Sequence, residues 1–206
     1  MRILLTDAGK RFNREWIFRH LNYEFSIGNS YAIIGPNGSG KSTLLQLLSG
    51  GMEFSEGTAS WQLQNGPIEN ETVYTQVSIC APYLELIEEM TLLEFLSFHQ
   101  QFKPFLAGIT KEYIIKLMGL ERAANKQIRF YSSGMKQRVK LAQAIFSNSL
   151  LVLLDEPCSN LDTAGIQLYH KLINEYCQYR LLIISSNEEA EYSFCKNKIN
   201  VSDYKS

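Results

Sequence analysis

The chain has 206 residues, 45% of them hydrophobic and 12% aromatic, which is enough apolar material for the core of one domain. Its 20 Lys and Arg residues are balanced by 21 Asp and Glu residues, for a net charge of -1. This composition lacks the basic excess that binding to a phosphate backbone usually requires, so nucleic acid is not an expected partner.

The cysteines and the apolar runs bear on the compartment. The four cysteines are scattered, without a CxxC pair or a histidine at metal-ligand spacing, which favours reduced thiols in a cytosolic protein. The longest apolar run, "LLVLL" at 150–154, is much shorter than a membrane span, and the N-terminal run is too short for a signal peptide. The sequence therefore predicts a chain that does not itself cross a membrane.

The N-terminal third is predicted to be mainly β-structure. Strands are expected at 2–12 and 16–25, where alternating aromatic residues are typical of a half-solvated antiparallel sheet, and at 31–34, a continuous apolar run typical of a buried strand. A short helix should begin near Lys41 and end at Gly50 and Gly51. Two further segments resemble strands closed by turn residues, 57–66 and 71–82.

The pattern becomes helical from about residue 91. Thr91 and Glu94 have the spacing of a capping box, and apolar residues at helical spacing predict helices over 91–102, 110–120 and 134–146. The chain then alternates: a strand at 150–154, a helix beginning near Asp162, a strand at 180–184, and a helix from Glu188. This order predicts an α/β fold with a mostly parallel sheet flanked by helices.

The strongest chemical signal is "GPNGSGKST" at 35–43, which fits the phosphate-loop pattern GxxxxGK[ST] and lies between an apolar strand and a helix. The glycines let backbone N–H groups converge on phosphate oxygens at the start of the helix. Lys41 should contact the terminal phosphates, and the Ser42 hydroxyl suits Mg²⁺. The alternative is a glycine-rich turn without a ligand. The predicted nucleotide contacts here are Gly35, Pro36, Asn37, Gly38, Ser39, Gly40, Lys41, Ser42 and Thr43.

A second element, "LLVLLDEP" at 150–157, places two acids at the carboxyl end of a buried strand. Asp155 is the predicted metal ligand, and Glu156 is predicted to orient or polarise an attacking water. An acidic pair alone would more often be a solvated turn. Together with the phosphate loop, it favours hydrolysis.

These residues resemble the ATP-binding cassette (ABC) ATPases over nearly the whole chain. Four blocks stand in the order of that family: "GPNGSGKST", "YSSGMKQR" at 131–138, which resembles the signature LSGGQ, then "LLVLLDEP", and "SNLD" at 159–162, which resembles the D-loop. The resemblance implies one ABC ATPase domain over 1–206, with a P-loop NTPase core, an N-terminal antiparallel β lobe and a helical lobe inserted at about 83–135.

The resemblance also implies ATP and Mg²⁺ as cofactors and a head-to-tail pair of cassettes, either a homodimer or two different chains. In such a pair the signature residues Ser132, Ser133 and Gly134, and Asp162 of the D-loop, would contact the nucleotide held by the other copy. The alternative for Ser132 is a simple helix cap. Phe12 is the expected adenine contact, with Trp16 as its competitor.

Several positions depart from the family pattern. In the signature, Tyr131 replaces Leu, Ser133 replaces the first Gly, and Met135 replaces Gln. Pro82 stands where the Q-loop glutamine is expected, and Ser186 stands at the switch histidine position, followed by Asn187. Because neither serine nor asparagine relays a proton as imidazole does, we expect slow hydrolysis, with Asn187 partly compensating by orienting the water. The predicted catalytic residues are Lys41, Glu156, Ser186 and Asn187.

The first functional hypothesis is an energy-coupling subunit that powers a separate membrane permease and lies on the cytoplasmic face of the membrane. Two alternatives stay open. One is an ABC-type ATPase that acts on a cytosolic complex, and the other is a nucleotide-gated interaction module with little hydrolysis. The sequence leaves the cargo, the direction of transport and the permease undetermined.

Overall fold

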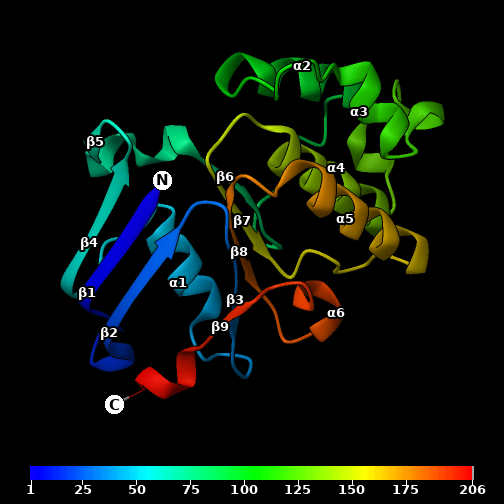
Figure 1. The fold of residues 1–206 in the computed structure, drawn as a ribbon. Helices are drawn as coiled ribbons and strands as arrows, with labels where there is room; N and C mark the ends of the chain where they lie inside the picture. The colour runs from blue at the N-terminus through cyan, green and yellow to red at the C-terminus, as the bar shows by residue number, and fades with distance from the viewer. Residues whose placement is uncertain (206) are drawn as a thin grey trace.

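The structure, a computed structural model, describes residues 1–205 and contains two β-sheets with helices between and beside them (Figure 1). The strands are β1 (Arg2–Phe12), β2 (Glu15–Ser26), β3 (Ser30–Ile34), β4 (Glu56–Leu63), β5 (Gly66–Ile68), β6 (Val77–Cys80), β7 (Leu151–Asp155), β8 (Leu181–Ser185) and β9 (Asn197–Asn200). The α-helices are α1 (Lys41–Leu48), α2 (Leu92–Phe102), α3 (Lys111–Leu117), α4 (Ser133–Phe146), α5 (Thr163–Tyr176) and α6 (Glu189–Tyr192). Short 3₁₀ helices are η1 (Asn70–Gln76), η2 (Glu121–Ala123), η3 (Ile128–Phe130) and η4 (Val201–Tyr204).

The N-terminal sheet is antiparallel, with the strand order β2-β1-β4-β5. β1 pairs with β2 on one edge and with β4 on the other. Ile3 and Leu5 of β1 are buried while Arg2 and Thr6 are exposed, which is the alternation of a sheet with one solvated face. The predicted antiparallel β lobe is confirmed.

The second sheet is parallel, with the strand order β6-β7-β8-β3-β9. Every residue of β7 and β8 is buried, because helices cover both faces of the sheet. Leu151 and Leu153 pack into the cluster that contains α1 and the antiparallel sheet, whereas Val152 and Leu154 pack into the cluster that contains α4 and α5. The sheet therefore separates two hydrophobic cores, and α1 lies between the two sheets (Figure 1).

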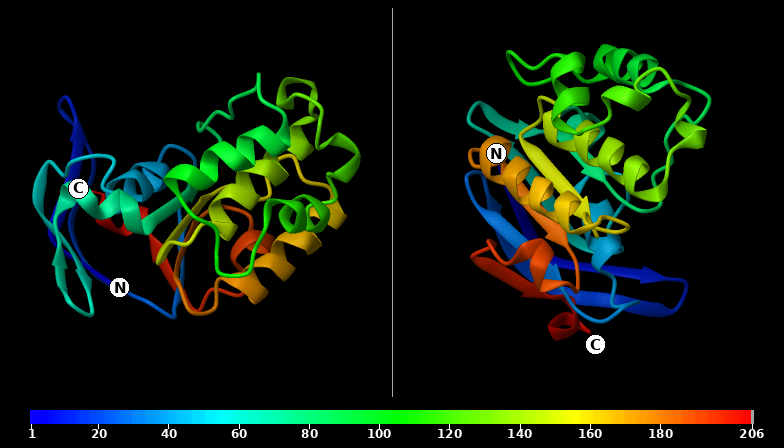
Figure 2. Two further views of the ribbon diagram at one scale, coloured as in Figure 1. Left: turned by 90° about the horizontal axis from the view of Figure 1, so that it is seen from above. Right: turned by 90° about the vertical axis from the view of Figure 1, so that its right-hand side faces the viewer.

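The helical part contains α2, α3 and α4, with α4 lying between the other two helices and the parallel sheet (Figure 2). The capping box at the start of α2 is present: the Glu94 N–H bonds the Thr91 hydroxyl, and the Thr91 N–H bonds the Glu94 carboxylate at 2.8 Å. The predicted helices at 91–102, 110–120 and 134–146 correspond to α2, α3 and α4. The limits of 83–135 for an inserted lobe stay a prediction.

Two predicted elements differ from the structure, and β9 is an additional strand. Residues 71–82 were expected to form a strand, but 70–76 form η1 and only 77–80 form β6, because the hydroxyls of Thr72 and Thr75 bond back to carbonyls three residues earlier and stabilise the tight turns. The helix expected from Glu188 is only the single turn α6. It ends at Tyr192, whose carbonyl oxygen accepts a tight-turn bond from the Cys195 N–H. β9 was not predicted, because the stretch 197–200 carries one buried apolar side chain, Ile199.

No helix within residues 1–205 combines the length and the hydrophobicity that a bilayer crossing needs.

Candidate functional site

The phosphate loop connects β3 to α1 at the carboxyl edge of the parallel sheet. Gly35, Gly38 and Gly40 all have positive φ angles, of 142°, 76° and 102°. A Cβ on Gly40 would lie 2.1 Å from Cγ2 of Ile17, and one on Gly35 would lie 2.8 Å from Oγ of Ser39. Both backbone conformation and close packing therefore require glycine, and the loop curls with its N–H groups at the start of α1.

Two side chains within the loop fit a phosphate ligand. Lys41 is 6% exposed, and its Nζ donates to the carbonyl oxygens of Gly35 at 2.8 Å and Pro36 at 3.3 Å. The Ser39 hydroxyl is buried and has no hydrogen-bond partner among the described residues. A phosphate oxygen would give this hydroxyl the acceptor it lacks, and the ammonium group would exchange carbonyl contacts for charge-assisted ones.

The acidic pair lies at the carboxyl end of β7, which is the neighbour of β8 in the parallel sheet. Asp155 is buried, and Glu156 is exposed with a positive φ of 45°, held by a bond from its N–H to the carbonyl of Ser185 at 2.9 Å. The positive φ of Glu156 turns the chain sharply, directly after Asp155, the last residue of β7. A serine hydroxyl, Ser42, and a carboxylate, Asp155, are donors that fit Mg²⁺, which takes few protein oxygens and completes its shell with phosphates and waters.

The switch loop follows β8 and contains Ser186 and Asn187. Asn187 Nδ2 donates to Oδ1 of Asn37 in the phosphate loop at 2.7 Å. Ser186 is only 1% exposed, and its Oγ accepts a bond from the Glu188 N–H at 2.9 Å. The structure therefore brings Asn187 to the phosphate loop, while the Ser186 hydroxyl bonds within the switch loop.

A cavity of about 310 Å³ opens between the phosphate loop, the turn after β7 and the switch loop. Its lining brings together three of the predicted catalytic residues, Glu156, Ser186 and Asn187. It also contains a buried acid that the sequence analysis did not single out, Glu191 on α6. The only sequence signal for Glu191 is its place in the run "NEEAE", where an acid in a helix usually indicates a solvated face.

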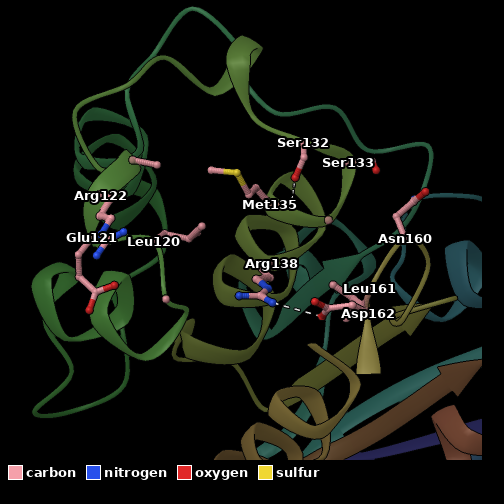
Figure 3. Close-up of a pocket in the computed structure, with 13 residues that line it drawn as sticks. Leu120, Glu121, Arg122, Ser132, Ser133, Met135, Arg138, Asn160, Leu161 and Asp162 are labelled. Atoms are coloured by element: carbon pink, nitrogen blue, oxygen red, sulfur yellow. Dashed lines mark hydrogen bonds and ion pairs between the residues drawn. The ribbon is translucent and has the colours of Figure 1, made fainter. Parts of the chain in front are cut away.

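The signature segment forms a different cavity, of about 660 Å³ (Figure 3). Ser132 is the N-cap of α4 and accepts a bond from the Met135 N–H at 3.2 Å, so the helix-cap interpretation of Ser132 describes its contact in this chain. The lining comes from η2, the signature and the D-loop: Gly119, Leu120, Glu121, Arg122, Ala123, Ser132, Ser133, Gly134, Met135, Arg138, Asn160, Leu161 and Asp162. This cavity shares no lining residue with the cavity beside the phosphate loop.

The signature and the D-loop are tightly packed. A Cβ on Gly134 would lie 2.9 Å from the carbonyl oxygen of Asn160, so this approach requires glycine. Asp162 caps α5 by accepting from the Gly165 N–H at 2.8 Å, and it pairs with Arg138 of α4 at 3.4 Å. Asp162 thus has contacts within its own chain and lies beside the signature rather than beside the phosphate loop.

The aromatic candidates lie beside the turn of the β1–β2 hairpin. Phe12 is 45% exposed, with Lys10 Nζ 5.2 Å from its ring centroid. The Trp16 ring is covered by the guanidinium group of Arg19, 4.1 Å from the ring. Ile17, next to Trp16, is the hairpin residue that contacts the phosphate loop through Gly40, and the sequence analysis did not identify it.

The segment that carries Pro82 is fixed to the signature helix. Lys140 Nζ donates to the carbonyl oxygen of Pro82 at 3.0 Å, and Lys136 pairs with Glu88 at 2.5 Å. Burial raises the pKa of the next residue, Tyr83, a hydrogen bond with Gln46 opposes this, and the nearby Asp155 carboxylate adds to it. A phenol therefore lies near Asp155, the predicted metal ligand, where the sequence lacks the expected glutamine.

The parallel sheet with its phosphate loop, the antiparallel lobe and the signature helix define a P-loop NTPase of the cassette type. A family model described as "ABC transporter" matches residues 18–159. The chain belongs to the ABC transporter family.

Two relatives and one solved structure of the same fold show what the chain is similar to. The uncharacterized ABC transporter ATP-binding protein YhcH of Bacillus subtilis is 28% identical over 206 residues, which cover 96% of this chain. The chain spans only 65% of the length of YhcH. The cytochrome c biogenesis ATP-binding export protein CcmA of Reclinomonas americana is 30% identical over 82% of this chain and 77% of its own. The solved structure of the ATP-binding cassette MJ0796, a dimer bound to ADP and Pi, has a TM-score of 0.78 at 23% identity, covering 96% of this chain and 93% of that one.

Proposed function

We propose that this chain is the ATP-binding and ATP-hydrolysing subunit of a transporter whose membrane permease is a separate polypeptide. The observation that carries the proposal is the cavity that Glu156 and Asn187 share beside the phosphate loop, at the carboxyl edge of the parallel sheet, with Asn187 bonded to Asn37 of the loop. Lys41 is held within the same loop by the Gly35 carbonyl oxygen. The family membership supports ATP as the nucleotide.

Nucleotide binding would use the loop 35–43 as a cradle. Backbone N–H groups at the start of α1 and the Lys41 ammonium group would hold the phosphates, and Ser39 would donate its unpaired hydroxyl proton. Ser42 and Asp155 would hold Mg²⁺, which when bound offsets the negative charge of the phosphates. Phe12 offers an exposed ring for the adenine.

Hydrolysis would depend on Glu156 as the residue that orients the attacking water. The strained turn at Glu156 aims its side chain into the cavity that it shares with Asn187. No imidazole lines this cavity within residues 1–205, so we expect slow basal turnover, below the typical enzyme median of about 10 s⁻¹.

A pair of cassettes would complete the site. Ser132, Ser133 and Gly134 begin the 14-residue helix α4, and its N–H groups and dipole suit the terminal phosphate of a nucleotide held by another copy. Because the signature cavity and the phosphate-loop cavity share no lining residue, one chain alone would leave the nucleotide uncovered. The relative MJ0796, which is a dimer bound to ADP and Pi, supports such a pair, either of identical or of different cassettes.

Coupling to a permease is supported by the names of two relatives, an ABC transporter ATP-binding protein and an ATP-binding export protein. On this basis we place the working protein at the cytoplasmic face of a membrane, bound to its permease. The two alternatives, action on a cytosolic complex and a nucleotide-gated module, make different predictions for turnover and partners.

The test combines nucleotide binding, oligomeric state and turnover of the purified chain with those of Glu156→Gln. We expect the wild type to bind Mg-ATP and hydrolyse it slowly, and Glu156→Gln to keep binding, lose turnover by roughly 10²-fold or more, and accumulate as an ATP-bound dimer in light scattering. No affinity at millimolar ATP in calorimetry would overturn the proposal. Binding with a turnover that Glu156→Gln leaves unchanged would favour the nucleotide-gated module.

A further inference from the structure

Glu191 on α6 is a buried carboxyl group with one unused oxygen. The residue is 4% exposed, and its Oε1 accepts a bond from the Cys158 N–H at 2.7 Å. The Tyr169 hydroxyl fixes the same residue through the Glu191 carbonyl oxygen, also at 2.7 Å. Oε2 is buried and has no hydrogen-bond partner among the described residues.

Glu191 lines the cavity of about 310 Å³ that also contains Glu156 and Ser186. Its bond to Cys158 holds the turn that follows Glu156, so the carboxyl group is attached to the part of the chain that carries the water-orienting acid. A buried carboxyl oxygen without a hydrogen bond is unfavourable and uncommon in native structures, so its presence here calls for a functional explanation.

Ser186 is a polar residue that lines the same cavity as this carboxyl group. Its Oγ accepts from the Glu188 N–H at 2.9 Å, whereas its contact with the Glu188 carbonyl oxygen is long, 3.5 Å. The Ser186 hydroxyl proton therefore makes only a weak hydrogen bond within the loop and is available for another acceptor. The oxygen keeps a second lone pair, which can accept from a donor at Glu191.

The surroundings favour the neutral form of Glu191. Burial raises its pKa, the nearby Ser186 hydroxyl and the bond from the Cys158 N–H oppose this, and the charges of Glu156 and Glu188 add to it. The other titratable groups that face it are the Cys158 thiol and the Tyr169 phenol, both of which have raised pKa values because of burial. Within residues 1–205 no Lys, Arg or His forms an ion pair with Glu191.

We propose that Glu191 and Ser186 form a hydrogen-bond chain that takes the place of the missing switch ring. Neutral Glu191 donates its Oε2 proton to Ser186 Oγ, and the Ser186 hydroxyl donates to a phosphate or water oxygen in the cavity. No proton is transferred between these groups. Glu191 is thus a positioning residue that acts through Ser186, and the inference rests on the proposed ATP hydrolysis.

The first experiment is the pH profile of steady-state ATP turnover for the wild type and Glu191→Gln. If the neutral acid is required, wild-type turnover falls as the pH rises through the raised pKa of Glu191, by up to about tenfold per pH unit. A glutamine amide donates in the same place and does not ionise, so Glu191→Gln should lose this decline, and the ratio of variant to wild-type turnover should rise with pH. Identical profiles would overturn the proposal.

Glu189→Gln is the matched control, because Glu189 is an exposed acid on the same helix and does not line the cavity. Its profile should follow that of the wild type.

Ser186→Ala should lower kcat by roughly 10- to 100-fold with an unchanged KM for ATP. Exposed Ser193→Ala should not lower it. In a double variant with Ser186→Ala, the pH effect of Glu191→Gln should disappear, since the chain is already broken. Equal kcat for Ser186→Ala and Ser193→Ala would overturn the proposal.

A measurement without turnover separates this inference from the proposed function. The side-chain carboxyl ¹³C signal of Glu191, assigned by its loss in Glu191→Gln, should titrate above the usual glutamate range in the nucleotide-free protein. Its midpoint should shift in Ser186→Ala, because the serine hydroxyl is the proposed hydrogen-bond partner of this carboxyl group. A titration in the ordinary range, or no response to Ser186→Ala, would overturn the hydrogen-bond chain even if the wild type hydrolyses ATP. The expected titration in a chain that binds ATP without hydrolysing it would leave the hydrogen-bond chain in place and contradict only the proposed function.

Discussion

Asn187 and Asn37 are joined by a hydrogen bond of 2.7 Å, from Nδ2 of the first to Oδ1 of the second, although 150 positions separate them. The bond exists because β8 and β3 are parallel neighbours, with Ser185 opposite Ile33, so the loops that follow them leave the same edge of the sheet. It is a direct link between the switch loop and the phosphate loop. Ser186, one residue earlier, is buried, and its hydroxyl bonds within the switch loop.

This geometry predicts where an introduced histidine would act. Asn187→His should raise basal ATP turnover by roughly 10- to 100-fold, because the ring would face the phosphate loop and supply the missing acid or base. Ser186→His should not raise it, because a site that is 1% exposed has no room for an imidazole. Steady-state turnover of the two variants decides the matter. An increase in Ser186→His alone would mean that the switch position is Ser186, as the sequence comparison indicated.

Lys41 should be essential for nucleotide binding. Lys41→Ala removes the charge at the centre of the loop, and we expect its affinity for Mg-ATP to fall by at least about 100-fold in calorimetry. Lys171→Ala is a suitable control, since Lys171 is exposed and its ion pair with Glu175 spans 3.8 Å on the surface of α5. Similar affinities for the two variants would contradict the assignment of the loop as the phosphate site.

The sequence predicts the short local motifs of this protein well. The phosphate loop and the capping box of α2 each depend on residues a few positions apart, so their spacing alone identifies them. The bonds from Asn187 to Asn37 and from Glu191 to Cys158 join loops 150 and 33 positions apart, and no periodicity encodes such pairs. The same limit applies to Ile17 above Gly40, which depends on how the hairpin folds over the parallel sheet.

Gly40 should tolerate alanine worse than other glycines of positive φ. Gly40→Ala adds a Cβ that would lie 2.1 Å from Ile17 Cγ2, whereas a Cβ on Gly28, with φ of 79°, meets no atom within 4 Å. Both substitutions strain the backbone, but only the first also overpacks the contact between hairpin and loop. We expect Gly40→Ala to lower the free energy of unfolding by about 1–3 kcal/mol more than Gly28→Ala in urea titrations. Equal losses would mean that the hairpin moves away from the loop without cost.

His99 on α2 gives the folded protein a specific sensitivity to acid. Its Nε2 lies 2.8 Å from Oγ of Ser147, and that hydroxyl is 2.5 Å from the Gln143 carbonyl oxygen, to which it donates, so the imidazole is the donor in the His99–Ser147 bond. Burial, with a smaller contribution from the charge of Lys103, lowers the pKa of His99 from 6.5 to about 4.

Because the pKa of His99 is lowered in the folded protein, the free energy of unfolding should decrease with acid. Above pH 6.5 the imidazole is neutral in both the folded and the unfolded chain, and its contribution to stability is fully present. As the pH falls from 6.5 to about 4, only the unfolded chain takes up the proton, so the free energy of unfolding decreases. His99→Gln should remove this part of the pH dependence while lowering stability at neutral pH, because the ring packs between Phe95 and Phe105. Urea titrations at several pH values test it: the difference in unfolding free energy between wild type and His99→Gln should shrink between pH 6.5 and 4, and a constant difference would show that His99 titrates alike in both states.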